Sequence, residues 1–267
     1  MNFNFGSNKS SPAKVDPTLT ADDGGWRETA KIIIHALLIA FVVRVFFYQP
    51  FNIPSGSMKD TLLVGDYLFV SKLSYGYSRY SFPLGLPAFT GRIFGSEPKR
   101  GDVAVFKLPR DNSTDYIKRV IGLPGDEIQM RNGVLHINGQ AVPKTRVADF
   151  TAQDEDGVAR STPRYQETLP NGVKYYVLDA EPNGAFDNTG VYKVPARHYF
   201  MMGDNRDNST DSRVTMSVGP VPYDNFVGRA DVMFFSVAID EGQSCHLLNP
   251  LRWPGCVRWR RLFNLVR

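Results

Sequence analysis

Cysteine and histidine are scarce in this chain. Only two cysteines, Cys245 and Cys256, and four histidines occur among its 267 residues. There is no CxxC pair and no histidine–cysteine cluster at zinc spacing, so we expect neither a metal nor a cofactor. In an oxidising compartment the two cysteines would form a disulfide, and in a reducing one they would be free thiols.

Acidic residues are missing from the end of the chain. The formal net charge is only +4, but residues 252–267 hold five arginines and no aspartate or glutamate. This basic tail, which we place at 241–267, suits an anionic membrane surface, although a solvated basic end explains it equally well. No basic stripe alternates with aromatic residues, so nucleic acid is not an expected partner.

Long hydrophobic runs are also missing, with one exception. Residues 32–48, IIIHALLIAFVVRVFFY, are apolar apart from His35 and Arg44. As a helix this run would be about 25 Å long, close to the ~30 Å hydrocarbon layer of a bilayer. We predict a transmembrane anchor at 31–48 after a disordered, polar tail at 1–30, with a buried core helix as the alternative.

Positive charge is concentrated on one side of this run. Lys9, Lys14, Arg27 and Lys31 precede it, and only Lys59 follows it in the comparable window. By the positive-inside rule, the N-terminus lies in the cytoplasm and the bulk of the chain lies across the membrane. The run is long for a cleaved signal peptide and no A-x-A-like site follows it, so we expect the anchor to stay in the protein.

No long amphipathic helix follows the anchor. Short runs rich in β-branched and aromatic residues are bounded by Gly, Pro and Asp, which is typical of strands. These runs are residues 66–73, 102–108, 115–122, 173–180, 198–204 and 226–237. Asn132-Gly133 between alternating segments predicts a tight hairpin. We therefore expect a mainly β body, with its core at 49–139 and 196–240 and a more polar inserted region at 140–195.

Two serines flank a glycine a few residues after the hydrophobic run, in the segment IPSGSMKD at 53–60. A serine hydroxyl is a weak nucleophile until a base removes its proton. No histidine is near Ser57 in the sequence, and none of the four lies in a motif that would orient it. A Ser-His-Asp triad assembled in space stays an alternative.

Lysine is the other candidate base, because burial in apolar surroundings disfavours its charged form. Lys118 lies in the strand-like stretch DYIKRVIG, where alternation places it on one face with Tyr116 and Val120. A surface lysine on a two-sided strand is the alternative interpretation. Spacing alone does not show that Ser57 and Lys118 meet.

A third segment, MGDNRDNSTDSR at 202–213, is dense in polar side chains. As a calcium-binding loop starting at Asp204 it fails, because its sixth position is Ser209 rather than glycine. It is instead either a plain polar loop or a support for the site. In the second case Ser209 would hydrogen-bond a neutral lysine, and Asp211 would pair with Arg213.

Together these stretches resemble the bacterial type I signal peptidases, membrane-anchored serine proteases that remove signal peptides from exported proteins. The matching motifs, in the family's order, are FNIPSGSM (51–58), TLLVGDYLFVSK (61–72), RGDVAVFK (100–107), DYIKRVIGLPGD (115–126) and GDNRDNSTDSR (203–213). The resemblance implies an antiparallel β-sheet catalytic core with an inserted β region, and preprotein signal peptides as substrates. It also implies an inner-membrane location, with the catalytic domain on the outer, periplasmic face.

The resemblance further implies roles for individual residues. Ser57 would be the nucleophile and Lys118 the general base, while the Ser57 N–H and the Ser55 hydroxyl would form the oxyanion hole. Ser209 would orient the Lys118 amine, and Gly203 would leave room beside it. The residues expected to form supporting ion pairs are Asp211 with Arg213 and Arg119 with Asp204.

Specificity for small residues at the −1 and −3 positions of the substrate is also implied. The residues that match the walls of those shallow pockets are Phe51, Ile53, Pro54, Met58, Leu62, Val105, Tyr116 and Ile117. One departure is visible: Asp60 stands where the family commonly has proline. A proline there would fix φ and remove a backbone donor, so the local rigidity of this turn is in question.

Two other functions stay open on the sequence. One is a related Ser–Lys hydrolase that processes a single exported protein, and the breadth of cleavage over unrelated precursors would distinguish it. The other is a membrane-anchored β domain that binds exported peptides without cutting them. That would require a lost catalytic residue, and none of the residues that the resemblance implies is missing.

Overall fold

A computed structural model describes residues 25–82, 89–153, 158–239 and 253–267. The chain divides into two units between Phe41 and Val42. Among the described residues, the first unit contributes most of one helix, and the second contains all of the strands.

The helix α1 spans Gly25–Phe46. The helix thus begins before and ends before the predicted anchor at 31–48, and the bounds of the membrane-spanning part stay a prediction. Its first turns are stabilised by a bond from Thr29 Oγ1 to Gly25 O (2.7 Å) and by the Lys31–Glu28 ion pair (3.0 Å). Hydropathy marks only the apolar part of such a helix, so it does not indicate the polar first turns. By length and composition α1 can cross a membrane.

The last turn of α1, which belongs to the second unit, is held by a buried lysine of the same unit. Lys72 Nζ donates to Arg44 O (3.0 Å), Val45 O (3.2 Å) and Ser81 O (2.5 Å). The final carbonyls of a helix have no intrahelical partner, and a cation is favourable there. Burial lowers the pKa of Lys72 to about 8.

The main sheet has eight strands in the order β1-β2-β16-β3-β4-β14-β15, with β17 also paired to β16. Its strands are β1 (Tyr48–Asn52), β2 (Asp66–Ser71), β3 (Val103–Lys107), β4 (Asp115–Gly122), β14 (His198–Met202), β15 (Val221–Pro222), β16 (Phe226–Ser236) and β17 (Asn264–Leu265). All these pairings are antiparallel. The predicted mainly β, antiparallel fold is confirmed.

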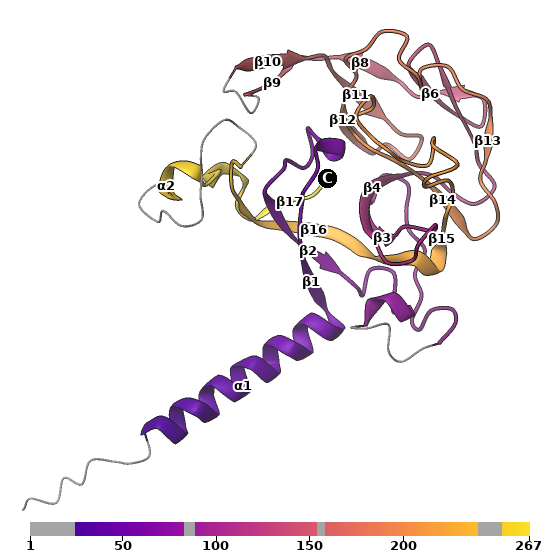
Figure 1. Ribbon diagram of the computed structural model, residues 1–267. Coiled ribbons are helices and arrows are strands. Elements are labelled where there is room, and N and C mark those ends of the chain that lie inside the picture. The colour runs from indigo at the N-terminus through magenta and orange to yellow at the C-terminus, as the bar shows by residue number, and fades with distance from the viewer. Residues whose placement is uncertain (1–24, 83–88, 154–157, 240–252) are drawn as a thin grey trace, which may run out of the picture. The chain divides into compact units, whose positions relative to one another are not determined.

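Strand β16 joins two parts of this sheet, since it lies between β2 and β3 (Figure 1). Its register shifts at Ala230/Val232 and Met233/Phe235 against β2, and at Phe226/Gly228 against β3. Such bulges bend a strand and increase its twist.

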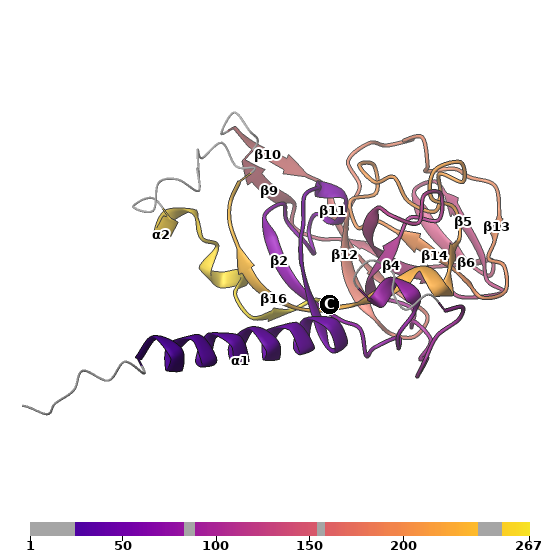
Figure 2. The same cartoon turned by 60° about the horizontal axis from the view of Figure 1, so that its bottom comes forward.

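Three smaller sheets contain the remaining strands, in the orders β12-β11-β8, β10-β9 and β13-β5-β6-β7. Their bounds are β5 (Glu127–Arg131), β6 (Val134–Ile137), β7 (Gln140–Ala141), β8 (Lys144–Arg146), β9 (Phe150–Gln153), β10 (Ala159–Thr162), β11 (Arg164–Thr168), β12 (Lys174–Leu178) and β13 (Tyr192–Lys193). The predicted hairpin joins β5 to β6, with positive φ at Asn132 (48°) and Gly133 (70°). Strands β7 and β13 of the inserted region pair with β6 and β5 of the predicted core, and β5, β6 and β13 lie together in Figure 2.

Short helices complete the described fold: η1 (Gly56–Met58), η2 (Arg79–Ser81), η4 (Tyr223–Asn225), η6 (Trp259–Arg261) and α2 (Trp253–Cys256). In the basic tail, Arg261 Nη2 lies 2.6 Å from the fully buried Asp66 Oδ2, so part of this tail packs on the protein. Cys256 is buried and disulfide-bonded, and Cys245 lies outside the described residues.

Strand β4 lies where three hydrophobic clusters meet. Its Ile121 belongs to one cluster, Ile117 packs against a second, and Val120 belongs to the third. This packing fixes β4 from several sides. Lys118 and Arg119 lie between Ile117 and Val120, so their backbone positions are fixed as well.

Candidate active site

Ser57 and Lys118 are brought together from different elements. Ser57 lies in η1, after β1, while Lys118 lies on β4 opposite Ala104 of β3. Lys118 Nζ is hydrogen-bonded to Ser57 Oγ at 2.7 Å, and it also donates to Ile117 O at 3.0 Å. Both residues are buried, with exposed fractions of 8% for Ser57 and 3% for Lys118.

Burial changes the proton affinity of this lysine. It lowers the pKa of Lys118 to about 8, although the negative charges of Asp211 and Asp204 act in the opposite direction. An ordinary lysine is almost wholly protonated at neutral pH, and a lowered pKa makes the neutral amine accessible. The neutral amine can accept the Ser57 proton along the same hydrogen bond.

Ser55 lies beside this pair. Its Oγ is 3.4 Å from Ser57 Oγ. Ser57 is the second residue of η1, so its N–H is among the first helical N–H groups, which lack an intrahelical acceptor. A hydroxyl and an N–H are therefore close to the position where Ser57 would react.

The segment that carries Ser57 is held by Asn205, a residue that the sequence analysis did not single out. Asn205 Nδ2 donates to Gly56 O (3.0 Å), and its N–H donates to Ser57 O (3.1 Å). The signal was present, since Asn205 belongs to the GDN start of the polar segment. Sequence spacing could not predict that Asn205 contacts Gly56 and Ser57, which lie almost 150 positions away.

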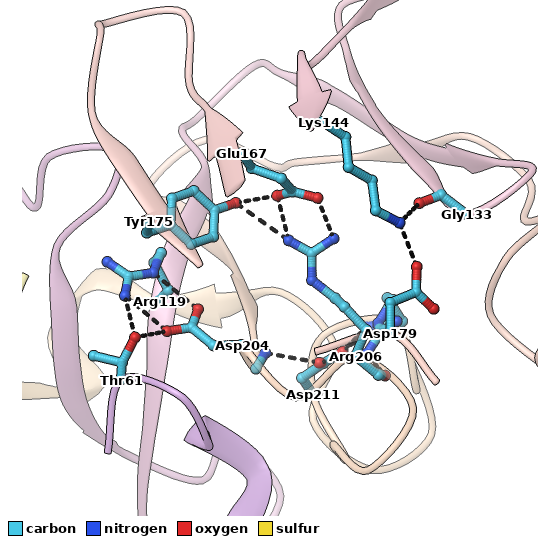
Figure 3. Close-up of polar contacts among 12 residues, drawn as sticks. Thr61, Arg119, Gly133, Lys144, Glu167, Tyr175, Asp179, Asp204, Arg206 and Asp211 are labelled. Atoms are coloured by element: carbon cyan, nitrogen blue, oxygen red, sulfur yellow. Dashed lines mark hydrogen bonds and ion pairs between the residues drawn. The ribbon is translucent and has the colours of Figure 1, made fainter. Parts of the chain in front are cut away.

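The predicted Arg119–Asp204 ion pair is present and includes a third residue, Thr61 (Figure 3). Arg119 Nε and Nη2 donate to the two Asp204 oxygens at 2.9 and 2.7 Å. Thr61 Oγ1 donates to Asp204 Oδ2 (2.6 Å) and accepts from Arg119 Nη2 (3.1 Å). Because Thr61 follows Ser57 by four residues, this cluster ties the serine segment to β4 and to Asp204, the second residue after β14.

Asp211 and Arg213 also form the predicted pair. Arg213 Nε and Nη2 each lie 2.9 Å from an Asp211 oxygen, and both residues are buried. Burial alone would raise the pKa of Asp211, but the Arg213 charge and the bond from Gly203 N–H hold it below its usual range. The carboxylate thus stays ionised and ordered within the loop.

A third buried ion pair lies next to these contacts and was not predicted. Arg206 donates to both oxygens of Glu167, at 2.8 and 2.5 Å, and the Tyr175 hydroxyl donates to Glu167 Oε2 at 2.5 Å (Figure 3). Glu167 lies on β11 and Tyr175 on β12, so these contacts attach the loop after β14 to the inserted region.

Ser209 and Gly203 lie side by side. A Cβ on Gly203 would overlap Ser209 Oγ and would come within 2.6 Å of Ser57 O, so only glycine fits. Ser209 Oγ is buried and forms no hydrogen bond of ordinary geometry within the described residues, although its hydroxyl, near Asp211, helps to lower the pKa of that carboxyl. The predicted bond from Ser209 to Lys118 is therefore not formed here, and its orienting role stays a prediction.

A cavity of about 570 Å³ opens beside Ser57 and Lys118. Of the eight residues predicted to contact substrate, Pro54, Tyr116 and Ile117 line it. The other five belong to or pack against one hydrophobic cluster: Phe51, Ile53, Met58, Leu62 and Val105. Their contact with substrate stays a prediction. Lining residues that were not predicted include Thr114, Asp115, Phe186, Asp207 and Asn208.

Histidine does not line this cavity in the described part of the chain. His136 Nδ1 contacts Val134 O and His198 Nδ1 contacts Ala196 O, while His246 lies outside the described residues. The alternative of a spatially assembled triad therefore finds no support among the histidines that are described.

Three carboxylates, those of Asp179, Asp187 and Asp207, come within 4.8 Å of one another. Each also contacts donors of the chain: Asp179 pairs with Lys144, and the other two accept backbone N–H groups. These local donors already account for the cluster.

In this antiparallel β fold a buried serine is hydrogen-bonded to a lysine beside a cavity. This is the chemistry of a serine hydrolase that uses a lysine base. A family described as "Signal peptidase, peptidase S26" matches residues 26–235. The chain therefore belongs to the signal peptidase S26 family of serine peptidases.

Two relatives of known sequence agree with this membership. Signal peptidase I of Rickettsia typhi is 43% identical over 85% of this chain and 89% of its own length. Signal peptidase I of Rickettsia canadensis is 41% identical over 90% of this chain and 91% of its own. A crystal structure of a signal peptidase I from Enterococcus faecalis shares 26% identity over 50% of this chain and 97% of its own, with a TM-score of 0.29.

Proposed function

We propose that this chain cleaves signal peptides from exported preproteins, with Ser57 as the nucleophile and Lys118 as the general base. Family membership supports the reaction and the substrate class. The observation that carries the assignment of residues is the buried 2.7 Å hydrogen bond between Lys118 Nζ and Ser57 Oγ at the wall of the cavity.

The first step is acylation. Neutral Lys118 takes the Ser57 proton while Oγ attacks the carbonyl carbon of the scissile peptide bond. The tetrahedral intermediate then collapses, and the Lys118 ammonium gives its proton to the departing amine. The signal peptide remains attached to Ser57 as an ester, and the mature protein leaves.

The second step is hydrolysis of that ester. Lys118, neutral again, takes a proton from water, and the resulting hydroxide attacks the ester carbonyl. Collapse expels Ser57 Oγ, which recovers its proton from Lys118. In both steps negative charge develops on the carbonyl oxygen, where the Ser57 N–H and the Ser55 hydroxyl would stabilise it. One such donor typically contributes about 3 kcal/mol to lowering the barrier.

Selection of small side chains at the −1 and −3 positions would follow from the apolar walls near Ser57. Pro54, Tyr116 and Ile117 line the cavity directly. Ile117 packs against a buried cluster that includes Ile53, Met58 and Leu62, and this cluster would limit the depth of the pocket. A large side chain would have to displace this close-packed cluster, which is costly.

Membrane attachment is the remaining part of the proposal. We infer that α1 is a single transmembrane anchor in the inner membrane, with its N-terminus in the cytoplasm and the catalytic unit on the periplasmic face. The apolar composition of α1 and the excess of lysine and arginine before it support this orientation. Protease added to the outside of spheroplasts should cut the catalytic unit, and protection of that unit would reverse the orientation.

Cleavage of a detergent-solubilised precursor with an A-x-A signal tests the assigned residues. Ser57→Ala and Lys118→Met should each lower the rate by about 10³-fold or more. His198→Ala and Lys174→Met, an exposed lysine of β12, should leave it within about twofold of wild type. Comparable cleavage by Lys118→Met would contradict the lysine base, and an inactive His198→Ala would indicate a histidine instead.

A further inference from the structure

Asp60, three residues after Ser57, has an unusual backbone. Its φ is 80°, in the left-handed region that non-glycine residues rarely adopt. Its side chain is only 9% exposed. A residue stays in such a conformation only when its surroundings hold it there.

The contact that holds it comes from the inserted region. Arg164 Nε lies 3.1 Å from Asp60 Oδ2, and the Arg164 guanidinium carbon lies 3.9 Å from the centre of the Tyr176 ring. Burial raises the pKa of Asp60, and the Arg164 charge opposes that shift. Removal of Arg164 would therefore leave a largely buried carboxylate without its counterion.

Strands β11 and β12, which carry Arg164 and Tyr176, also hold the other end of the Ser57 segment, residues 56–61. Arg164 of β11 is opposite Leu178 of β12, and Leu178 forms a parallel bridge to Asn205. Asn205 in turn binds Gly56 O and Ser57 O. Figure 1 shows β11 and β12 side by side. The Ser57 segment contacts Asn205, and Asn205 contacts β12. Strand β12 pairs with β11, and Arg164 of β11 contacts Asp60 of the Ser57 segment. These contacts therefore form a closed ring.

We propose that the Asp60–Arg164 ion pair is a positioning contact that makes the inserted β region part of the catalytic machinery. It fixes the end of the Ser57 segment while Asn205 fixes the start, and together they set the position of Ser57 Oγ relative to Lys118. The inference rests on the proposed role of Ser57.

The expected effect is on turnover rather than on binding. Neither Asp60 nor Arg164 lines the cavity beside Ser57, so the substrate contacts should survive when the pair is removed. A displacement of about 1 Å at a reacting group can cost about 100-fold in rate. Partial loosening of one end of the segment should therefore lower kcat by about tenfold and leave KM within about twofold.

The test uses the full chain in detergent and a precursor with an A-x-A signal. The variants are Asp60→Asn, Arg164→Gln and the double variant, because asparagine tolerates a positive φ and removes only the charge. Lys193→Gln is the matched control, since it removes an exposed ion pair with Glu127 from the inserted region without reaching the Ser57 segment. Rates are normalised to the concentration of serine that a covalent inhibitor titrates, so a loss of folded enzyme does not count as a loss of kcat.

The proposal expects the two single variants to lower kcat similarly, the double variant to be no worse than either, and the control to match wild type. Arg164→Lys should recover part of the rate, because it restores the charge. Unchanged kcat in both single variants would overturn the proposal, as would losses that multiply in the double variant or appear in KM alone. Ser57→Ala is assayed in parallel: if it still cuts, the proposed nucleophile is wrong, whereas an inactive Ser57→Ala with an unaffected Arg164→Gln refutes only the positioning role.

Discussion

Lys118 Nζ lies 2.7 Å from Ser57 Oγ, although 61 positions separate the two residues in the sequence. The contact is made where β4 passes η1, and both side chains are buried there. Burial disfavours the charged form of this lysine, and the acidic neighbours Asp204 and Asp211 are already paired with arginines. The consequences of this burial are measurable in both rate and stability.

The rate of cleavage should depend on pH through Lys118. Its pKa is lowered to about 8, and only the neutral amine can take the Ser57 proton. We expect kcat/KM to rise about tenfold per pH unit below that pKa and to level off above it. The measurement is a pH profile with a precursor whose own groups do not titrate in this range. A profile that is flat from mildly acidic to alkaline pH would contradict the neutral-lysine mechanism.

Lys118 should also lower the free energy of unfolding at neutral pH. The pKa of Lys118 falls from an ordinary 10.5 to about 8 on folding, so between these values the unfolded chain binds more protons than the folded one. The free energy of unfolding therefore rises with pH across that window, and it is lowest below it. Lys118→Met removes this cost, so at pH 7 it should be more stable than wild type by up to about 3 kcal/mol.

Denaturant titrations at pH 7 and pH 10 would measure this difference, and the gap between Lys118→Met and wild type should shrink at the higher pH. Lys174→Met, at an exposed position, should differ from wild type by less than about 0.5 kcal/mol at both. A Lys118→Met variant that is less stable than wild type at pH 7 would show that the packing of the lysine stem outweighs its desolvation.

Much of the β structure was predictable because strand signals are local. The runs that became β2, β3, β4, β12, β14 and β16 carry their own β-branched and aromatic residues, and the Asn132-Gly133 hairpin carries its own turn chemistry. The support of the Ser57 segment was not predictable from such signals. Asn205 and Arg164 reach it from separate parts of the chain, and only the tertiary fold decides which polar residues meet.

Burial was the other feature that the sequence did not reveal. A motif match indicates that Met58, Leu62 and Val105 are near the substrate, but it does not distinguish a residue on the wall of a cavity from one that packs beneath it. Their exposed fractions of 0–2% show that all three are packed in the interior, and their contact with substrate stays a prediction. Pairing of β13 with β5 was likewise unforeseen, because a polar two-residue strand gives no periodicity.

The buried ion pair between Arg206 and Glu167 should be a major contributor to stability. Arg206→Gln leaves the Glu167 carboxylate buried with only Tyr175 as a side-chain donor, and an unpaired buried charge typically costs about 3–5 kcal/mol. Arg197→Gln removes an exposed pair with Asp224 and should change stability by less than about 1 kcal/mol. Thermal unfolding of both variants tests this, and equal midpoints would contradict it.

Gly203 should tolerate no side chain. A Cβ there overlaps Ser209 Oγ and approaches Ser57 O to 2.6 Å, so Gly203→Ala should displace one or both serines and lower kcat/KM by about 100-fold. Gly190→Ala is the matched control, because a Cβ at that position meets nothing within 4 Å. If Gly203→Ala cleaves like Gly190→Ala, the close approach is not required for activity.

Asp60→Pro tests the backbone of the Ser57 segment directly. Proline is common at this position in the resembling family, yet its φ is fixed near −65°, whereas Asp60 has a φ of 80°. In this chain the substitution should therefore be harmful, with a loss of stability above about 1 kcal/mol and a lower kcat/KM than wild type. Asp60→Gly is the control, because glycine adopts a positive φ freely while also lacking the carboxylate. A proline variant clearly worse than the glycine variant would assign the difference to backbone conformation. Equal activity of the two would mean that the segment reaches its working geometry without the left-handed residue.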